Sequence, residues 1–363
     1  MITVTCLVAL IFAVFGGGLA AETTVSTAST GQIIVGYEGR WDLQDSGVTD
    51  ELRDVTFVTP LIGWAVGSNN TIIKTADGGA TWQRQAERRE SGPDYREVTM
   101  LNENEGWVAS RGELLYTSNG GQSWRPATFT GISNSLGSGA VVGPIRFQLY
   151  VPAGNTSPSL ARTEDGGNAW IPVARSVPFG NNPSRVHFVD AQRGWMTGVT
   201  QLVPPAYGLA TTEDGGATWR VIDQRANSSG GVQFVNPMTG WVLGEDGTTI
   251  LATTNGGASW ERQFTNFERN QPLTDMHFVN EPVGHVLSST SGNPCGSGDC
   301  LKVIRTVDGG NTWGLLGSVG TPDHVNALSF PDTEHGWVVG ARGYIIHYHL
   351  VPVYEELDGE IME

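Results

Sequence analysis

Short segments in which apolar and polar residues alternate recur along most of the chain. Each group begins with a segment such as DVTFV (54–58) or RVHFV (185–189), continues with a glycine-tryptophan segment such as GWAVG (63–67), and reaches a third apolar segment such as TIIKT (71–75). Segments of this kind, separated by Gly, Asn and Asp, are typical of antiparallel hairpins. Beyond the first 20 residues, no stretch repeats its apolar residues at the spacing of a helix. The pattern therefore predicts an all-β chain.

An octapeptide ending in tryptophan follows the third segment in six of these groups. The copies recur every 41 to 53 residues and read TADGGATW (75–82), TSNGGQSW (117–124), TEDGGNAW (163–170), TEDGGATW (212–219), TTNGGASW (253–260) and TVDGGNTW (306–313). Five other tryptophans follow a glycine in the second segment or near the C-terminus: Trp64, Trp107, Trp195, Trp241 and Trp337. Repetition at this period indicates a repeat architecture, in which each group is one unit.

The octapeptide has the composition of a tight turn between two strands. Gly-Gly adopts positive φ at little steric cost, and the preceding Asp or Asn accepts hydrogen bonds from nearby backbone N–H groups. Two copies have Asn119 and Asn255, which keep this geometry but lack the charge of the other four, Asp77, Asp165, Asp214 and Asp308. We therefore interpret these residues as structural. We expect the closing tryptophans to start a fourth strand and pack against the core: Trp82, Trp124, Trp170, Trp219, Trp260 and Trp313.

The six octapeptides resemble the Asp-box (BNR) repeat, S/T-x-D-x-G-x-T-W, with a second glycine in every copy. That repeat occurs in β-propellers, where it joins the third and fourth strands of a four-stranded antiparallel blade. A seventh group (327–350) has three strands and no octapeptide, and the segment around Trp41 can supply its fourth strand. Such closure leaves no exposed sheet edge. We expect a seven-bladed propeller over 32–350, with six blades and a disordered remainder as the alternative.

Two groups depart from the pattern. Residues 138–173 lack the Gly-Trp pair, so we expect an irregular third blade. The sixth group has Gly284-His285 in place of Gly-Trp and a long insertion that holds Cys295 and Cys300. In an exported protein a disulfide between these cysteines is the natural interpretation. A two-cysteine metal site is the alternative, but the loop contains no histidine to complete it.

The ends of the chain differ from the repeats. Residues 1–21 carry no charge and are mostly apolar, which indicates a signal peptide for export to the periplasm, the extracellular space or a thylakoid lumen. The start lacks Lys and Arg, so an uncleaved membrane anchor is the alternative, and we expect no other membrane contact. The tail 351–363 is acidic, and we expect it to be disordered.

Composition narrows the class of partner. The net charge is −16, whereas a protein that follows a nucleic-acid backbone needs the opposite sign, so nucleic acid is disfavoured. Only Lys74 and Lys302 are lysines among the 21 basic residues. Arginine is enriched at protein interfaces, which favours a protein partner, although a genomic preference for Arg codons would give the same bias.

Among Asp-box propellers, the combination of V-x-F-V, G-W-x-V-G and T-x-D-G-G-x-T-W is most similar to the photosystem II stability/assembly factor family. The similarity covers nearly all of the chain beyond the leader. It implies a non-enzymatic, exported scaffold that binds a membrane-protein assembly intermediate. We expect a monomer without a cofactor or metal.

The alternative function is that of a secreted carbohydrate-active protein, either glycan-binding or a sialidase- or glucanase-like hydrolase. Asp-box sialidases need an early Arg-Ile-Pro segment, and the chain offers only the reverse order at 144–146. His347 and His349 share one face of a strand, but zinc would need two further ligands. We interpret this pair as edge-strand residues.

A surface patch is the sharper candidate site. In a four-stranded blade, the loops between blades and the loops between strands two and three emerge on one face, opposite the octapeptides. We predict that this face carries a protein-binding patch of Arg and Tyr, which are common hot-spot residues: Arg88, Arg89, Tyr95, Arg96, Arg111, Arg185, Arg269, Arg342 and Tyr344. The alternative is that several of these arginines pair with local acids such as Glu87, Glu90 and Asp94.

Overall fold

The computed structural model describes residues 32–127, 132–152, 157–179, 183–199, 207–223, 231–244, 247–265, 272–289, 301–319 and 324–356. These residues form strands and one short 3-10 turn, η1 (Ala341–Gly343). No helix among them is long and apolar enough to cross a membrane. The chain divides into two compact units, one over Glu38–Val351 and one formed by Met1–Tyr37 with Pro352–Glu363.

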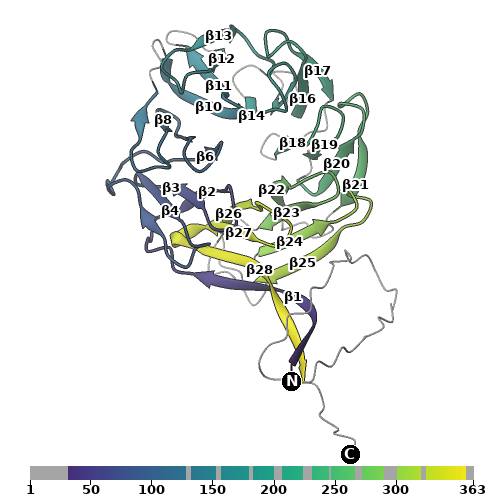
Figure 1. Cartoon of the computed structure of the whole chain (residues 1–363). Coiled ribbons are helices and arrows are strands. Elements are labelled where there is room, and N and C mark those ends of the chain that lie inside the picture. The colour runs from purple at the N-terminus through teal and green to yellow at the C-terminus, as the bar shows by residue number, and fades with distance from the viewer. Residues whose placement is uncertain are drawn as a thin grey trace, which may run out of the picture. The chain divides into compact units, whose positions relative to one another are not determined.

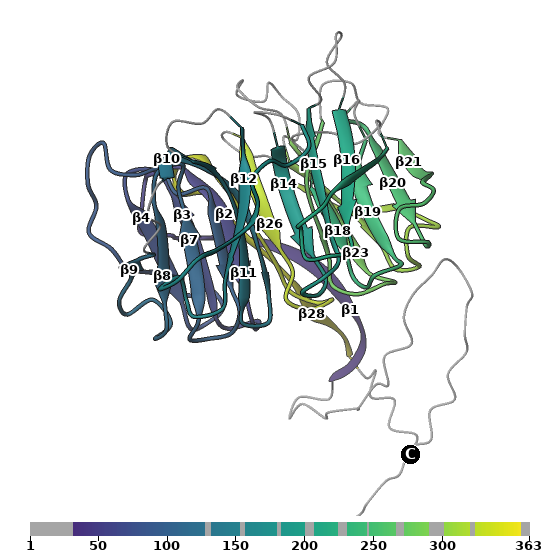
Figure 2. The same ribbon diagram turned by 90° about the horizontal axis from the view of Figure 1, so that it is seen from above.

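The unit Glu38–Val351 is a ring of seven four-stranded antiparallel sheets, seen along its axis in Figure 1. From the direction of Figure 2, the strands run between two opposite faces of the ring. Six sheets consist of four consecutive strands, and the seventh has the order β1-β28-β27-β26. The predicted seven-bladed fold is confirmed, and the six-bladed alternative is wrong.

Each blade has the same four positions, counted from the centre of the ring. The first strands are β2 (Leu52–Phe57), β6 (Glu97–Met100), β10 (Ile132–Val142), β14 (Pro183–Phe188), β18 (Val232–Phe234), β22 (Leu273–Phe278) and β26 (Val325–Ser329). The second strands are β3 (Gly63–Gly67), β7 (Gly106–Ala109), β11 (Ile145–Pro152), β15 (Gly194–Val199), β19 (Gly240–Leu243), β23 (Gly284–Ser289) and β27 (Gly336–Gly340). The third strands are β4 (Thr71–Thr75), β8 (Leu114–Thr117), β12 (Ser159–Thr163), β16 (Tyr207–Thr212), β20 (Thr249–Thr253), β24 (Leu301–Thr306) and β28 (Ile345–Glu356). The outermost strands are β5 (Gln83–Arg84), β9 (Arg125–Pro126), β13 (Ile171–Ala174), β17 (Arg220–Asp223), β21 (Glu261–Thr265), β25 (Gly314–Val319) and β1 (Gln32–Gln44).

The N-terminal strand closes the ring. β1 pairs with β28 as the outermost strand of the last blade, and the Trp41 ring packs on Tyr348 with centroids 5.1 Å apart. At the end of β1, the Gln44 side-chain amide donates to the carbonyl of Gly78, 2.8 Å away, in the octapeptide turn of the next blade. The closure therefore uses both sheet pairing and side-chain contacts to the first blade.

Residues 351–356, which we expect from the sequence to be disordered, continue β28 in the structure. The acidic residues begin only at Glu355, and the preceding VPVY contains the β-branched and aromatic residues that favour a strand. β1, which begins at Gln32, supplies the neighbouring strand. The leader 1–21, both cysteines of the predicted disulfide and residues 357–363 lie outside the described residues.

Stacked rings join neighbouring blades. The tryptophan of a second strand lies on the phenylalanine that ends the first strand of the next blade, with centroids 3.5 Å apart in the pairs Trp337–Phe57, Trp195–Phe234 and Trp241–Phe278. His285 takes this place on Phe330, with centroids 3.6 Å apart. A Cβ added to Gly240 would lie 2.4 Å from the Phe234 ring, so the glycine before tryptophan makes room for the stack.

The octapeptide is the turn that the sequence indicates. In the first copy, the Thr75 hydroxyl donates to the Asp77 carboxylate at 2.8 Å and accepts the Gly79 N–H at 2.8 Å. Asp77 also accepts the Thr81 N–H at 2.9 Å, and Gly79 has φ +88°. Asn119 accepts the equivalent backbone N–H at 2.9 Å. The side-chain oxygen therefore organises the turn whether or not it carries a charge.

The third blade is irregular, as predicted. The pairing of β10 with β11 shifts register on both sides of Leu136. β10 ends in Val142 rather than an aromatic residue, so Trp107 of the preceding blade meets other partners. Its ring lies 4.8 Å from the Tyr116 ring and 5.3 Å from the Arg146 guanidinium. The aromatic stack is therefore absent between the second and third blades, and β6 of the second blade likewise ends in a non-aromatic residue, Met100.

Candidate functional site

A pocket of about 960 Å³ opens on the face opposite the octapeptide turns, along the second blade and next to residues of the first and third blades. Its wall comes from the loop that joins the first and second blades (85–96), from the β7–β8 turn (110–113) and from Leu136 of β10. Arg96 and Arg111 are its basic residues, and we call it the arginine pocket. The inter-blade and strand-two-to-three loops that form it are those predicted from blade topology.

A buried carboxylate fixes the loop that walls the pocket. The Asp50 side chain is only 3% exposed, and it accepts hydrogen bonds from Asn69 at 2.8 Å, Arg84 at 3.1 Å and Arg88 at 3.2 Å. Burial raises the pKa of Asp50, but these hydrogen bonds outweigh it and lower the pKa overall. Asn69, which lines the pocket, has φ 56°, so this contact holds it in the left-handed region.

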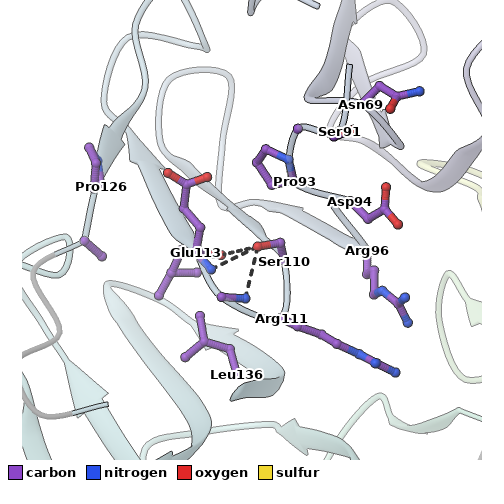
Figure 3. A pocket seen from close by; sticks show the side chains of 14 residues that line it. Asn69, Ser91, Pro93, Asp94, Arg96, Ser110, Arg111, Glu113, Pro126 and Leu136 are labelled. Carbon is purple, nitrogen blue, oxygen red and sulfur yellow. Dashed lines mark hydrogen bonds between the residues drawn. The ribbon is translucent and has the colours of Figure 1, made fainter. Parts of the chain in front are cut away.

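The β7–β8 turn positions two opposite charges. The Ser110 hydroxyl accepts the N–H of Glu113 at 2.9 Å and the N–H of Gly112 at 3.3 Å, which fixes the backbone of the turn. Figure 3 shows Arg111 and Glu113 pointing to opposite sides of this turn. The hydroxyl of Tyr95 lies 3.1 Å from the Glu113 carboxylate and holds it in place.

Arg96 and Arg111 extend side by side from neighbouring loops (Figure 3). Burial lowers the pKa of Arg96, and the positive charge of Arg111 lowers it further. Within the described ranges, no side-chain hydrogen bond or ion pair joins either guanidinium to another residue. The charges of Asp94 and Glu51 oppose this lowering, but neither acid forms an ion pair with Arg96, so an anionic group bound beside the two guanidiniums would stabilise them.

A second pocket of about 320 Å³ adjoins the first and shares Arg96, Ser110 and Arg111 with it. It reaches Arg185 on the innermost strand β14. Burial raises the pKa of Asp54 on innermost strand β2 to about 7, and the charge of Arg185 opposes this rise. Three of the predicted arginines therefore lie around one continuous concave surface.

The other predicted patch residues lie elsewhere. Tyr95 is only 1% exposed, so its assignment to the surface patch was wrong, because its ring packs in the core between β3 and β6. Arg88 pairs with Asp50 and with Glu90, as the alternative interpretation suggested. Arg89, Arg342 and Tyr344 do not line the arginine pocket or the pocket next to it. Arg269 lies outside the described residues.

Sequence reasoning missed Asp50 and Glu113. Nothing in the repeat pattern marks Asp50, because it precedes the first strand of its blade and its partners are spread over β4, β5 and two loops. Glu113 could have been found, since it stands two residues after Arg111 in a loop of the correct face.

The histidine pair of β28 packs within the closing blade. The His347 ring lies 4.3 Å from Trp337 and 5.0 Å from His349, and burial lowers the pKa of His347 to about 4. His349 Nε2 lies 2.7 Å from Asp42 of β1. In the part of the chain that the structure describes, no group of three or more His, Cys, Asp or Glu is arranged to hold a metal.

A pocket of about 240 Å³ next to an octapeptide turn contains residue types found in sugar sites: Glu105, Trp107, Tyr116, Glu164 and Asp165. Local contacts occupy several of them. The Arg125 guanidinium lies 4.7 Å from the Tyr116 ring, and Asp165 accepts the backbone N–H of Ala169 at 3.0 Å. Glu164 pairs with Arg162 at 3.3 Å.

Comparisons with known proteins agree with this architecture. A chain from Synechococcus sp. (strain CC9902), "Photosystem II assembly lipoprotein Ycf48", is 26% identical over 93% of this chain and 95% of its own length. The solved structure "YCF48 bound to D1 peptide" is 19% identical, has a TM-score of 0.63, and covers 85% of this chain and 96% of its own. A GH74 xyloglucanase from Xanthomonas campestris is 14% identical, with a TM-score of 0.56 over 84% of this chain and 53% of its own.

The likeness to the two solved structures shows the fold alone. The family model described as "Photosynthesis system II assembly factor YCF48" matches residues 35–136 and 163–263, which is more than half of the chain. The two matched segments contain five of the six octapeptides in full. The chain therefore belongs to the photosynthesis system II assembly factor YCF48 family, in agreement with the resemblance seen in its repeats.

Proposed function

We propose that this protein is an exported, non-enzymatic assembly factor that binds an intermediate of a membrane-protein complex through the arginine pocket. Family membership supports the assembly role, as do the names of the relatives. The complex we propose is photosystem II, and the contact is with an acidic segment of one of its subunits. The solved structure "YCF48 bound to D1 peptide" supports binding of a peptide segment.

The observation that carries this proposal is the pair of guanidiniums of Arg96 and Arg111, which repel each other and form no ion pair with an acid of the described residues, although Asp94 and Glu51 act on Arg96 from a longer distance. Arginine presents a planar fork that binds carboxylates through two parallel hydrogen bonds. Because the chain carries a net charge of −16, a local cationic pocket gives an acidic segment one place to bind. Hydrogen bonds hold Asn69 to Asp50 and fix the β7–β8 turn through Ser110, which reduces the entropy lost on binding.

Residues 1–21 serve export in this proposal and either are cleaved or anchor the protein to the membrane. A related chain is named a lipoprotein, which supports an anchored form on the side of the membrane reached by export. We propose the thylakoid lumen or the periplasm as the compartment, and a monomer as the working form.

The test is capture of photosystem II assembly intermediates from detergent-solubilised thylakoid membranes on the immobilised full chain. The variant Arg96→Glu/Arg111→Glu removes the cationic pair, and Arg193→Glu/Arg220→Glu makes the same charge change on the opposite face. We expect the pocket variant to capture at least about tenfold less and the control to match the wild type. Equal loss in both variants, or none in the pocket variant, would contradict the proposal.

The alternative is a carbohydrate-active protein, which the pocket around Trp107 and Tyr116 favours. Calorimetric titration with xyloglucan oligosaccharides and a reducing-sugar assay test it directly. We expect neither binding nor release of sugar. Binding that Trp107→Ala abolishes would replace the proposal.

A further inference from the structure

The arginine pocket runs from the innermost to the outermost strand of the second blade. It extends from Arg96, which precedes the innermost strand β6, to Pro126, which ends the outermost strand β9. The adjoining pocket continues inward to Arg185 on innermost strand β14. The positive charges of this surface therefore lie toward the axis of the propeller.

Glu113 supplies a negative charge on the outer side. Its carboxylate points away from Arg96 and Arg111 in Figure 3, and it contacts the hydroxyl of buried Tyr95 at 3.1 Å. No cationic side chain of the described ranges lies within ion-pair distance of it. Asp94, the other acid of the pocket, lies 3.6 Å from Arg53 and so has a partner.

Apolar residues line the pocket beside the charged ones: Leu114, Leu136, Pro93 and Ala127. A purely acidic ligand would be attracted at the inner end but repelled by Glu113 at the outer end. Discrimination of this kind needs both an attractive and a repulsive element.

We propose that the arginine pocket selects a dipolar peptide segment and binds it in one orientation, with an acidic side chain inward at Arg96 and Arg111 and a basic side chain outward at Glu113. This inference rests on the proposed function and adds to it the sequence class of the ligand. Because Arg111 and Glu113 belong to one fixed turn, the distance between the two charged groups of the ligand is set by the protein.

The experiment is selection of a displayed library of random decapeptides on the immobilised full chain, followed by sequencing. The variants are Glu113→Gln, which keeps the hydrogen bond to Tyr95, and Arg96→Ala/Arg111→Ala. Glu90→Gln is the control, because Glu90 is an exposed acid of the neighbouring loop that does not line the pocket. Circular dichroism melting of each variant verifies the fold.

On the wild type and the control we expect enrichment of peptides with an acidic residue and a Lys or Arg at a fixed spacing and order. On Glu113→Gln the acidic enrichment stays and the basic enrichment falls at least threefold. Acidic peptides without a paired basic residue on the wild type, or basic enrichment that survives Glu113→Gln, would overturn this inference alone. Acidic enrichment that survives loss of both arginines, or no enrichment at all, would overturn the proposed function as well.

Discussion

Trp337 joins the closing blade to the first blade, and its truncation tests how strongly the ring is held shut. The side chain is fully buried and stacks on Phe57 of β2 with centroids 3.5 Å apart. Burial of a tryptophan removes about 150–250 Å² from water, an upper bound of about 4–6 kcal/mol. Large-to-small changes of this kind cost about 3–5 kcal/mol in measured cores. We expect Trp337→Ala to lower the free energy of unfolding by about 3–5 kcal/mol.

The assay is urea unfolding followed by far-ultraviolet circular dichroism, in one transition for the wild type. The matched control is Trp82→Ala, since Trp82 is half-buried and meets the edge of the same Phe57 ring. We expect a smaller loss for this control, and an intermediate loss for Trp337→Phe, which keeps a stacked ring. A loss below about 1 kcal/mol for Trp337→Ala, or a separate early transition, would refute the view that this stack helps to close one cooperative ring.

Two further predictions concern the repeat itself. Gly240→Ala places a Cβ 2.4 Å from the Phe234 ring, whereas the same change at Gly314 meets no atom within 4 Å. Thermal melting should show that only Gly240→Ala lowers the free energy of unfolding, by about 1–3 kcal/mol. Equal melting temperatures for the two variants would count against the steric role of Gly240. Hydrogen bonds in the octapeptide turns lower the aspartate pKa values below 3.8, so the stability they add is present above that pH and is lost as pH falls through the folded-state pKa. A variant with Asn in place of Asp77, Asp165, Asp214 and Asp308 should show a smaller fall in melting temperature between about pH 6 and pH 3 than the wild type. An equal fall in both proteins would contradict this linkage.

Local, repeated signals made the fold predictable. The octapeptides are self-contained turns that mark six blades, and a Gly-Trp pair marks the second strand of most blades, so the three-stranded group 327–350 could be recognised as a seventh. Trp41 could be placed because a ring that lacks one outer strand needs another to close it. Where the repeat weakened, at 138–173, the blade was correctly expected to be irregular.

The site was less predictable because its residues lie in loops that do not repeat. Blade topology placed Arg96 and Arg111 on the predicted face. It could not show that the Tyr95 side chain is buried in the core or that Arg88 forms an ion pair with Asp50. Those outcomes depend on packing between residues about 25 to 40 positions apart in the chain. The sequence does not predict the extension of β28, because the acidic residues at the end of the tail are typical of a disordered segment, whereas the preceding VPVY favours a strand.

Site-specific photo-crosslinking tests the central claim most directly. A photoreactive amino acid at Pro126, on the rim of the arginine pocket, is compared with one at Gln122, on the octapeptide side of the same blade. Each full-length protein is irradiated with solubilised photosystem II assembly intermediates, and the joined peptides are identified by mass spectrometry. We predict that Pro126 crosslinks to an acidic segment of one membrane subunit and that Gln122 gives little product. Crosslinking of that subunit mainly from Gln122, or from neither position, would contradict binding at the arginine pocket.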